Sequence, residues 1–505
     1  MKEYIQQAYR LAKTERQKHD AEISEAYLYT RPNRDIYRSE SSTTDRTKIF
    51  DSTAPEGVQN LVSTILNLLI PQNQQWATLS VREDLKERVA SDIKAQLDTA
   101  NRSVFKTLRD SNFYVCASEA LTDAIIAGVG CLGTYEDKSG INFIAIPSYQ
   151  LYFLDNHKNE VDTVFRDHAL PGHYLLEAYS SKLSESMRQS CQKNPYKSVK
   201  VLESCFRKPN EKDYTYVVQL SEDGEIMETR KMPVQMFTVF RFGKTVGDVW
   251  GESPVRMALP HIRVINEAQT LFMQAAAFMS LGAWQVSSDT AVNFGNMKLR
   301  PGDVVTVDQP LQAIPFAGNT NITEATIESH RTMIRSMLFN DVILPPDRPT
   351  YQTAAEVQIR QAAFFQKIGP YGLRLEQEFL RPLIGNLITR LQARGEIAPL
   401  QIASEFLELV VNSAVKRGIA LTEITRDLQI LQQVSALGPN AILNVDLQKM
   451  ARKILRDGDM SPEVIKSEMQ VQEEIDQQSQ QQQGQQLAML AQQMQDQSAQ
   501  TPTAP

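Results

Sequence analysis

Cysteine is scarce in this sequence, and its spacing argues against two kinds of stabilised small domain. Four cysteines occur among 505 residues, Cys116, Cys131, Cys191 and Cys205, and no two of them form a CxxC pair. No histidine stands at zinc-finger spacing from them, and no HExxH motif is present. The pattern therefore argues against a disulfide scaffold and against a zinc module. We expect reduced, mostly buried thiols and no bound metal.

Positive charge is also in short supply. Lys and Arg number 53 against 60 Asp and Glu, which gives a formal net charge of −7. A protein that holds nucleic acid by neutralising its phosphates usually carries a broad basic surface, and this composition argues against one. The same charge is compatible with a protein that lets DNA slide past without retaining it.

Long hydrophobic runs are missing. The most apolar stretch, Ala275–Trp284, is about ten residues long, whereas a membrane-spanning helix needs about twenty. The first residues, MKEYIQQAYRLAK, lack the apolar segment of a secretory signal. We therefore predict no membrane partner and synthesis in the cytoplasm.

A complete catalytic or nucleotide-binding motif is missing as well. Gly243–Thr245 reads GKT, but a phosphate-binding loop needs a glycine five residues before the GK, and Thr238 stands there. The placement of serine, histidine and aspartate suggests no nucleophile with its base and orienting group. We predict no enzymatic activity, no catalytic residue and no cofactor.

The patterns that are present predict an α+β, mainly helical protein. Its length exceeds what one hydrophobic core usually serves, so we expect two or more modules. Apolar periodicity predicts a helix over residues 1–30, another over 51–70 and two within 86–127. Short strand-like runs separated by turn residues follow from 128 to 242 and predict a small antiparallel sheet.

A second group of helices follows this sheet. The periodicity predicts a helix over 254–284, a strand-rich insert, a helix over about 322–342 and a proline-rich loop. A very long helix from Thr353 to about Arg394 comes next, which Pro370 and Pro382 should kink or interrupt. A strand at 406–411 and helices from about 420 to 475 complete the pattern. Periodicity alone also allows an ordinary helical hairpin with an inserted subdomain.

The composition changes abruptly near the end of the sequence. Fifteen of the thirty-one residues 470–500 are glutamine, a bias that is typical of disorder. Apolar residues nevertheless recur from residue 464 to residue 494 at spacings compatible with a helical seam. These residues are Val464, Val471, Ile475, Leu487, Leu490 and Met494. For 471–505 a barrel helix and a disordered tail both stay open.

Several motifs resemble the portal (head-to-tail connector) proteins of short-tailed, podovirus-type bacteriophages. The longest runs from Trp250–Pro254 (WGESP) through MALP at 257–260 to Asn266 and Glu267. The others are FDST at 50–53 with LIP at 69–71 and Trp76, GVG at 128–130 ahead of Ile146-Pro147 and Tyr152, TAAEV at 353–357 with Arg360, and the stretch from GP at 369–370 to LRPL at 380–383. No single motif is diagnostic, but their order from about residue 5 to 460 is specific.

The resemblance implies the portal fold of wing, stem, clip and crown, assembled into a ring of usually twelve subunits at one capsid vertex. On that template 1–253 and 353–415 form the wing, and 254–284 and 322–342 form the two stem helices. The template assigns 285–321 to the clip, 343–352 to the channel (tunnel) loop and 416–470 to the crown.

The resemblance also implies candidate functional residues. In the channel loop the DNA-facing candidates are Pro345, Pro346, Asp347, Arg348, Pro349, Thr350 and Tyr351. On the clip the candidates for partner docking are Lys298, Arg300, Asp303 and Asp308. Arg348 is the one basic residue of its loop, and Asp347 beside it offsets the charge.

The implied function is a conduit through which double-stranded viral DNA is packaged and ejected without sequence specificity. The implied partners are other copies of the chain, the packaging ATPase (terminase), a tail adaptor, the major capsid protein and scaffolding or internal core proteins. One alternative is another ring or scaffold component of a virion, such as a tail adaptor, although adaptors are usually much shorter. A nucleic-acid-processing enzyme would need a nucleotide loop or a carboxylate-metal cluster, and the sequence suggests neither.

Overall fold

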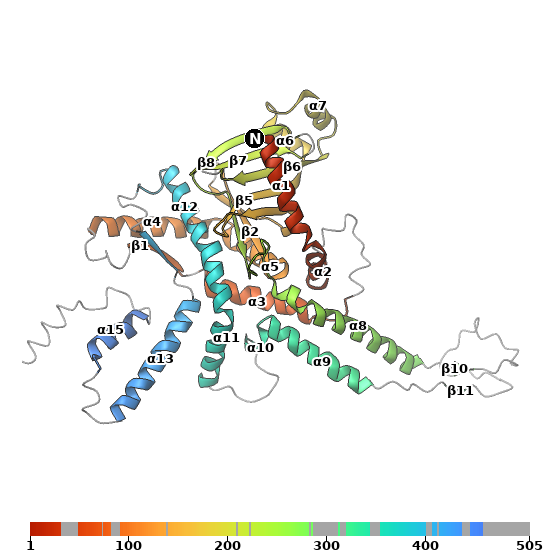
Figure 1. Cartoon of the computed structure of the whole chain (residues 1–505), viewed down its shortest axis with the longest axis vertical. Coiled ribbons are helices and arrows are strands. Elements are labelled where there is room, and N and C mark those ends of the chain that lie inside the picture. Colours follow the sequence, from red (N-terminus) through yellow and green to blue (C-terminus); the bar gives the residue numbers. More distant parts are fainter. Residues whose placement is uncertain are drawn as a thin grey trace, which may run out of the picture. The chain divides into compact units, whose positions relative to one another are not determined.

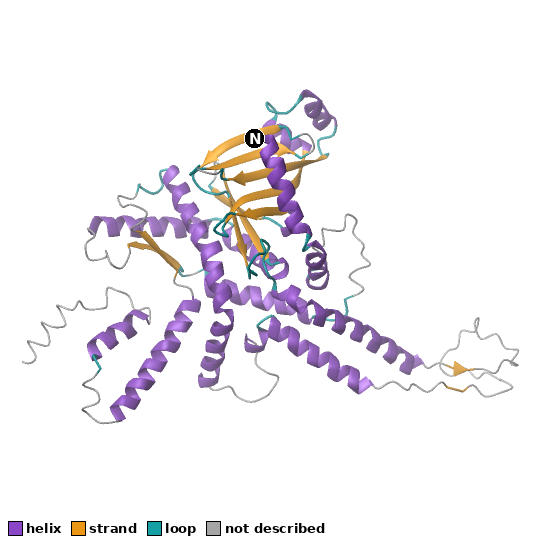
Figure 2. Cartoon of the chain, viewed as in Figure 1, coloured by secondary structure: helices purple, strands orange, loops and turns teal. Residues whose placement is uncertain are grey.

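The chain separates into two compact units, Met1–Val415 and Lys416–Pro505. The computed structural model describes residues 1–31, 49–72, 74–81, 91–137, 140–208, 211–221, 224–281, 284–285, 312–313, 320–343, 354–399, 407–411, 414–436 and 445–457. Helices make up most of the regular structure and strands the remainder, so the α+β, mainly helical class is confirmed (Figure 2). None of the helices in the described ranges is both long and apolar enough to cross a bilayer.

The helices of the first unit fall into an N-terminal group and a group after the sheets (Figure 1). The N-terminal group is α1 (Lys2–Gln17), α2 (Asp20–Thr30), α3 (Thr53–Leu69), α4 (Ser91–Asp110) and α5 (Phe113–Ala127). Between strands lie η4 (Ser148–Gln150), α6 (Gly172–Tyr179) and α7 (Glu185–Lys193). The later group is α8 (Pro254–Leu281), α9 (Thr320–Met337), α10 (Asn340–Ile343), α11 (Ala354–Leu375), the π-helical turn η6 (Glu376–Leu380) and α12 (Arg381–Ala393).

The strands form two sheets and two short ribbons. The five-stranded antiparallel sheet follows the chain order β4 (Leu151–Asp155), β5 (Val161–Pro171), β6 (Ser198–Phe206), β7 (Tyr214–Leu220), β8 (Ile226–Met232). The three-stranded sheet has the order β3 (Ile141–Ala145), β2 (Val129–Glu136), β9 (Phe237–Arg241). The ribbons pair β1 (Ala77–Val81) with β12 (Leu407–Val411) and β10 (Trp284–Gln285) with β11 (Gln312–Ala313).

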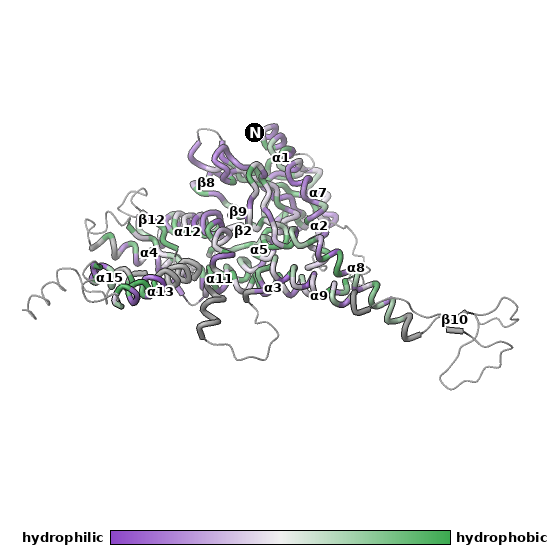
Figure 3. The backbone as a smooth tube through the Cα atoms, turned by 60° about the horizontal axis from the view of Figure 1, so that its bottom comes forward, coloured by the Kyte–Doolittle hydropathy of each residue, from purple (hydrophilic) through white to green (hydrophobic). Residues whose placement is uncertain are grey.

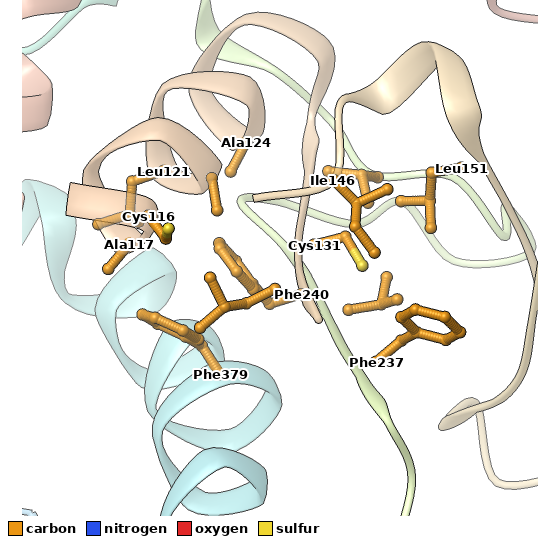
Figure 4. Packing of buried hydrophobic residues seen from close by; sticks show 14 of the residues in the cluster. Cys116, Ala117, Leu121, Ala124, Cys131, Ile146, Leu151, Phe237, Phe240 and Phe379 are labelled. Carbon is orange, nitrogen blue, oxygen red and sulfur yellow. The ribbon is translucent and has the colours of Figure 1, made fainter. Parts of the chain in front are cut away.

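Helix α5 lies at the centre of the main hydrophobic core. Its sequence, FYVCASEALTDAIIA, is apolar on most sides, and most of its residues are buried. It packs against β2, β3, α3 and α8, and its neighbours include Phe240 of β9 and Phe379 of η6, whose rings stack 4.3 Å apart (Figure 4). A helix that is apolar all round needs such burial on every side. It ends at Gly128, whose φ of +91° is a left-handed conformation that favours glycine.

The five-stranded sheet is covered on both faces, and the alternation of its strands shows why. Phe165, Leu202 and Val217 face a small core with Ile5 of α1, whereas their neighbours Val164, Val201 and Val218 belong to the main core. Successive side chains of a strand point to opposite faces, so each strand contributes to both layers. Strand β8 at the outer edge lies in the hydrophilic colour of Figure 3.

The structure corrects the expected N-terminal helix. Residues 1–30 were predicted as one helix, but they form α1 and α2 with a break at Lys18 and His19. The two helices have different supports: α1 packs on β4, whereas α2 packs on α5 and α8. A straight helix cannot follow both surfaces, and His19 is held at the break by Asp248, 3.2 Å away.

The small sheet of the prediction is also larger than expected. The pattern missed β1, β6 and β8, and it missed the helical pair α6–α7 between β5 and β6. The two helices predicted within 86–127 are confirmed as α4 and α5, and the strand at 406–411 is confirmed as β12.

In the second unit the structure describes two helices. These are α15 (Leu447–Asp457) and α13 (Ala414–Ala436), apart from the first two residues of α13, which fall in the first unit. A shallow apolar pocket lies between them, lined by Ile430, Leu431, Val434, Val445 and Met450, with Asp427 and Lys449 at its side.

Candidate functional site: the α8–α9 hairpin and its anchors

Helices α8 and α9 lie side by side and extend from the core toward the β10–β11 ribbon (Figure 1). The helix predicted over 254–284 is found as α8, and the helix predicted over 322–342 is found as α9 followed by the short α10. Each helix buries one stripe, and together the stripes consist of Val255, Ala258, Leu259, Ile262 and Ile265 on α8 with Ile327 and Ile334 on α9.

The start of α8 is fixed by the WGESP segment. Ser253 is fully buried, and its Oγ accepts a hydrogen bond from Arg256 N at 3.1 Å, which caps the helix N-terminus. The same hydroxyl lies 2.6 Å from the carbonyl oxygen of Ile125, to which it donates. Trp250 Nε1 donates to the carbonyl oxygen of Ala127 at 3.0 Å. The segment therefore attaches α8 to the end of α5.

Two glycines allow this attachment. A Cβ on Gly251 would lie 2.0 Å from the carbonyl oxygen of Gly128, and a Cβ on Gly128 would lie 2.3 Å from that of Gly251. No side chain fits at such a distance from backbone. The GVG and WGESP motifs thus meet at one backbone contact.

Ion pairs join the hairpin to the N-terminal helices. On α8, Arg256 Nη2 lies 2.6 Å from Glu22 Oε2, and Arg263 pairs with Glu25. On α9, Arg331 Nη2 lies 2.9 Å from Asp51 Oδ2. Burial raises the pKa of the Asp51 carboxyl, but hydrogen bonds from Thr53 and Arg331 outweigh that effect and hold the pKa below its usual value. Asp51 therefore stays ionised and holds α9 at the start of α3.

A buried cluster of charges connects the two sheets with the α11–α12 segment. The Arg241 side chain is 1% exposed, and its guanidinium donates to Glu378 Oε1 at 2.9 Å and to Asp155 Oδ2 at 2.7 Å. It also donates to the carbonyl oxygens of Val249 at 3.2 Å and Asn159 at 3.0 Å. Burial lowers the pKa of Arg241, but Glu378 and Asp155 outweigh it and raise the pKa above its ordinary value. Arg241 is therefore a permanent buried cation.

The geometry around Lys244 argues against a phosphate-binding loop. Lys244 Nζ lies 2.5 Å from Asp155 Oδ2, and both side chains are 8% exposed. Gly243 forms a backbone bridge with Glu252. Lys244 thus pairs with Asp155 in the buried cluster, and the backbone of Gly243 is already hydrogen-bonded to Glu252. Within the described ranges, no three or more His, Cys, Asp or Glu side chains gather as metal ligands would.

The predicted channel-loop and clip residues lie outside the described residues. This holds for Pro345, Pro346, Asp347, Arg348, Pro349, Thr350 and Tyr351, and equally for Lys298, Arg300, Asp303 and Asp308. Their flanks are described: α10 ends at Ile343 and α11 begins at Ala354. Trp284 pairs with Ala313 and Gln285 with Gln312, so the two ends of the insert meet beyond the hairpin.

Sequence reasoning missed the buried cluster. Arg241 is the one charged residue of the strand FTVFR, and Glu378 stands between Gln377 and Phe379 in EQEFL. The sequence did contain one signal of the cluster, which is the charge of Arg241 inside an apolar run. Because a buried charge requires a partner, such a residue indicates a buried ion pair. Nothing in the sequence indicates which partner, since 137 residues separate the two.

Comparisons with known proteins agree on one family. A model of the family described as bacteriophage head to tail connecting protein matches residues 2–465. The portal protein of Escherichia phage T7 is 22% identical over 98% of this chain and 94% of its own length. The portal protein of Salmonella phage epsilon15 is 21% identical, over 88% of this chain and 84% of its own. The portal protein of Enterobacteria phage T3 is 20% identical over 86% of this chain and 83% of its own length.

The family match covers all the motifs quoted from the sequence, from FDST at 50–53 to LRPL at 380–383, together with the anchors described above. The match ends at residue 465, so the whole glutamine-rich segment 470–500 lies beyond it. The chain belongs to the bacteriophage head to tail connecting protein family.

Proposed function

We propose that this chain is the subunit of a portal ring at one capsid vertex, through which viral DNA is packaged and later ejected. The observation that carries the proposal is the family match over residues 2–465, joined by relatives named portal protein that align over most of both lengths. The protein acts as a structural conduit and docking platform, and the ATP-driven motor is a separate protein.

The α8–α9 hairpin supports the assembly part of this proposal. The face of α8 opposite its buried stripe carries Met257, Val264 and Leu271, which are 40%, 41% and 57% exposed. Their seven-residue spacing places them on one line along the helix, as in a coiled-coil seam. Such a line is expected to be covered by a neighbour. In a closed ring every subunit offers one face of its hairpin to each of two neighbours.

We assign the segments of the chain to the parts of this ring as follows. Residues 1–253 and 353–415 form the wing, 254–284 and 322–342 the stem around the channel, and 416–470 the crown. Residues 285–321 form the clip, which docks the packaging ATPase and then the tail adaptor, with Lys298, Arg300, Asp303 and Asp308 as contact residues. The major capsid protein and scaffolding or internal core proteins are further partners of the ring.

Electron microscopy of the purified chain tests the ring. We expect closed rings, twelve-fold in most particles, with a central hole wide enough for a DNA duplex. Native mass measurement at micromolar concentration and physiological salt should give the matching multiple of the subunit mass. A stable monomer under these conditions contradicts the proposal.

The channel loop 343–352 is proposed to line the narrowest part of the conduit. Its three prolines disfavour a continuous helix, and Asp347 offsets the charge of Arg348, so the loop can contact phosphates without retaining them. Arg348→Ala should leave ring formation normal but change the packaged genome length or its leakage, and Arg348→Glu should do so more strongly. Wild-type packaging and retention with both substitutions would leave the loop as a plain connector.

A further inference from the structure

The apolar pocket between the two helices of the second unit is open to solvent. Helices α13 and α15 lie side by side (Figure 1), and residues of both line the pocket. Ile430 of the pocket is 50% exposed, and Leu447 next to it on α15 is 49% exposed. None of the α13 and α15 residues whose side chains are described is buried. Helices in proteins gain most of their stability by packing an apolar face, so this pair needs a further element over the pocket.

The sequence directly after α15 predicts another helix. Residues 458–505 lie outside the described ranges, and their sequence carries the signals. Helix α15 ends at Asp457, and Gly458 follows it, as glycine commonly does at the end of a helix. Ser461, Pro462 and Glu463 come next. Serine is a preferred N-cap, proline suits the first helical position, and an acidic residue in the first turn interacts favourably with the helix dipole.

This predicted helix is apolar on one face and acidic as a whole. Val464, Val471 and Ile475 recur at spacings of seven and four residues, so they share one face of a helix. Residues 463–476 include five acidic residues and one lysine, whereas α15 includes four basic residues and one acidic residue. Opposite charges of this kind favour association between the two segments.

We propose that residues 462–476 form a helix that packs over the α13–α15 pocket of the same chain. Val464, Val471 and Ile475 fill the pocket. Glu468 falls on the same face of the predicted helix and pairs with Lys449, which lies at the side of the pocket. The Lys449 side chain is 83% exposed and has Asp446 at 3.2 Å, so its ammonium can accept a second carboxylate.

The length of the connection favours the same chain over a neighbouring one. Six residue steps lead from Asp457 to Glu463, and six residues span at most about 20 Å. Packed helices lie about 8–10 Å apart, so the segment reaches the pocket beside the helix that it follows. Because the contact lies within one chain, it does not depend on ring formation.

The glutamine-rich residues farther along the chain are the alternative occupant. Leu487, Leu490 and Met494 also share a helix face. However, residues 477–495 contain no charged side chain, so nothing in them complements the basic residues of α15. This difference makes the glutamine-rich segment a suitable control.

Crosslinking of the full-length chain tests the contact directly. A carbodiimide joins a lysine amine to a carboxylate in contact with it, and peptide mass spectrometry identifies the joined residues. We expect a bond between Lys449 and Glu468. In protein assembled from a mixture of unlabelled and heavy-isotope-labelled subunits, both halves of the crosslinked peptide should carry the same label.

Hydrogen exchange of the full-length chain, followed by mass spectrometry, tests the packing. Val471→Asp should speed exchange in residues 463–475 by about tenfold or more and also speed exchange in α13 and α15, because a charge enters the pocket. Lys449→Glu and Glu468→Lys should each speed it about fivefold, and the double variant should restore slow exchange because the reversed pair forms again. Leu487→Asp/Leu490→Asp is the matched control and should exchange like the wild type.

Three results overturn the proposal. One is exchange in residues 463–475 that Val471→Asp leaves unchanged. Another is crosslinked peptides that combine the two labels, which assign the pocket to the segment of a neighbouring subunit. The third is faster exchange of α13 and α15 in Leu487→Asp/Leu490→Asp but not in Val471→Asp, which assigns the pocket to the glutamine-rich segment.

Discussion

Removing the Arg241 guanidinium leaves the carboxylates of Glu378 and Asp155 without their main cation in the interior. Lys244 and Arg374 still contact them, so the loss is partial. Breaking a buried pair typically costs about 3–5 kcal/mol, and we expect Arg241→Met to lower the free energy of unfolding by about 3 kcal/mol. Urea denaturation followed by circular dichroism measures the change.

An exposed ion pair provides the control for this prediction. Arg335 lies 3.0 Å from Glu328, and the two side chains are 42% and 54% exposed, so Arg335→Met should cost less than about 1 kcal/mol. Adding Glu378→Gln to Arg241→Met should recover part of the loss, because one buried charge then disappears. Equal losses for the two arginine variants would show that the buried cluster contributes no more than a surface pair.

His168 predicts an acid-dependent loss of stability. Its Nε2 lies 3.3 Å from Glu203 Oε1, while its Nδ1 is buried and has no hydrogen-bond partner among the described residues. Burial, together with the nearby charge of Arg166, lowers the pKa of His168 to about 4. Between about pH 6.5 and pH 4 the unfolded chain therefore binds a proton that the folded chain does not, and stability falls as pH falls.

This effect is measured as a difference between two proteins. We expect wild type to lose about 1–2 kcal/mol relative to His168→Asn when the pH is lowered from 7 to 5. Urea titrations at both pH values give the numbers, and the difference removes the contribution of other titrating groups. A difference that does not change with pH would mean that His168 is protonated in the folded chain as readily as in the unfolded one.

Individual residues mark the limit of what the sequence could predict about the site. Thr238 stands where a phosphate-binding loop requires glycine, and this was enough to argue against such a loop, because the whole motif lies within a short stretch of sequence. The partner of Lys244 was not predictable, since Asp155 lies 89 residues away, at the end of β4. The contact between His261 on α8 and His330 on α9, whose Nδ1 atoms lie 2.9 Å apart, was equally hidden, because it depends on the register between two helices separated by the insert.

At the scale of elements, the prolines correctly predicted that the long helix beginning near residue 353 is interrupted, but not where the interruption falls. Pro370 and Pro382 were expected to kink or interrupt it, yet α11 continues through Pro370 and the break falls at η6. Pro382 has no N–H for the carbonyl of Glu378, so the regular hydrogen-bond pattern fails just before it. Arg241 holds the carboxylate of Glu378 in that turn, an influence that periodicity does not contain.

The missed strands have a related cause. Strand β6, SVKVLESCF, lies inside the five-stranded sheet and buries Glu203 and Ser204 together with its apolar residues. The hydroxyls of Tyr135 and Tyr216 donate to Glu203 at 2.8 and 3.1 Å, so the sheet tolerates a polar run that reads as a loop. Helices with a clear apolar stripe were predictable, whereas elements supported by distant polar partners were not.

The exposed line on α8 carries a prediction for assembly. Val264→Glu places a charge in the middle of the line formed by Met257, Val264 and Leu271, which the ring would cover. The substitution should leave the single chain folded but lower the ring fraction at least tenfold at micromolar concentration. Size-exclusion chromatography with light scattering measures the ring fraction, and circular dichroism reports the fold.

Val115→Glu is the matched control, because Val115 is 65% exposed near the start of α5, whereas the segment before α8 is attached at the end of α5, at Ile125 and Ala127. It should assemble like the wild type. If both variants assemble normally, this face of α8 is not buried between subunits.

At the scale of the whole molecule, the charge of the chain bears on how DNA passes through the proposed ring. Each subunit brings a formal charge of −7, so the assembled surface has no general excess of cations to neutralise phosphates. Many of the arginines on the hairpin and its base are already paired, as Arg331 and Arg335 are with Glu328. We therefore expect purified rings to give no mobility shift of linear duplex DNA at micromolar concentration and about 100 mM salt.

A charge-reversed hairpin makes this expectation testable. In Glu324→Lys/Glu328→Lys two exposed acidic residues of α9 become basic, Arg335 loses its partner Glu328, and Arg331 keeps only Asp51. This variant should bind DNA, and its log K should fall steeply with log salt because each phosphate contact adds about −0.9 to the slope. Wild-type rings that bind at 100 mM salt with a slope of about −3 or steeper would instead reveal a cluster of phosphate contacts. Such a cluster would hold DNA in place, which contradicts a conduit that must release its cargo.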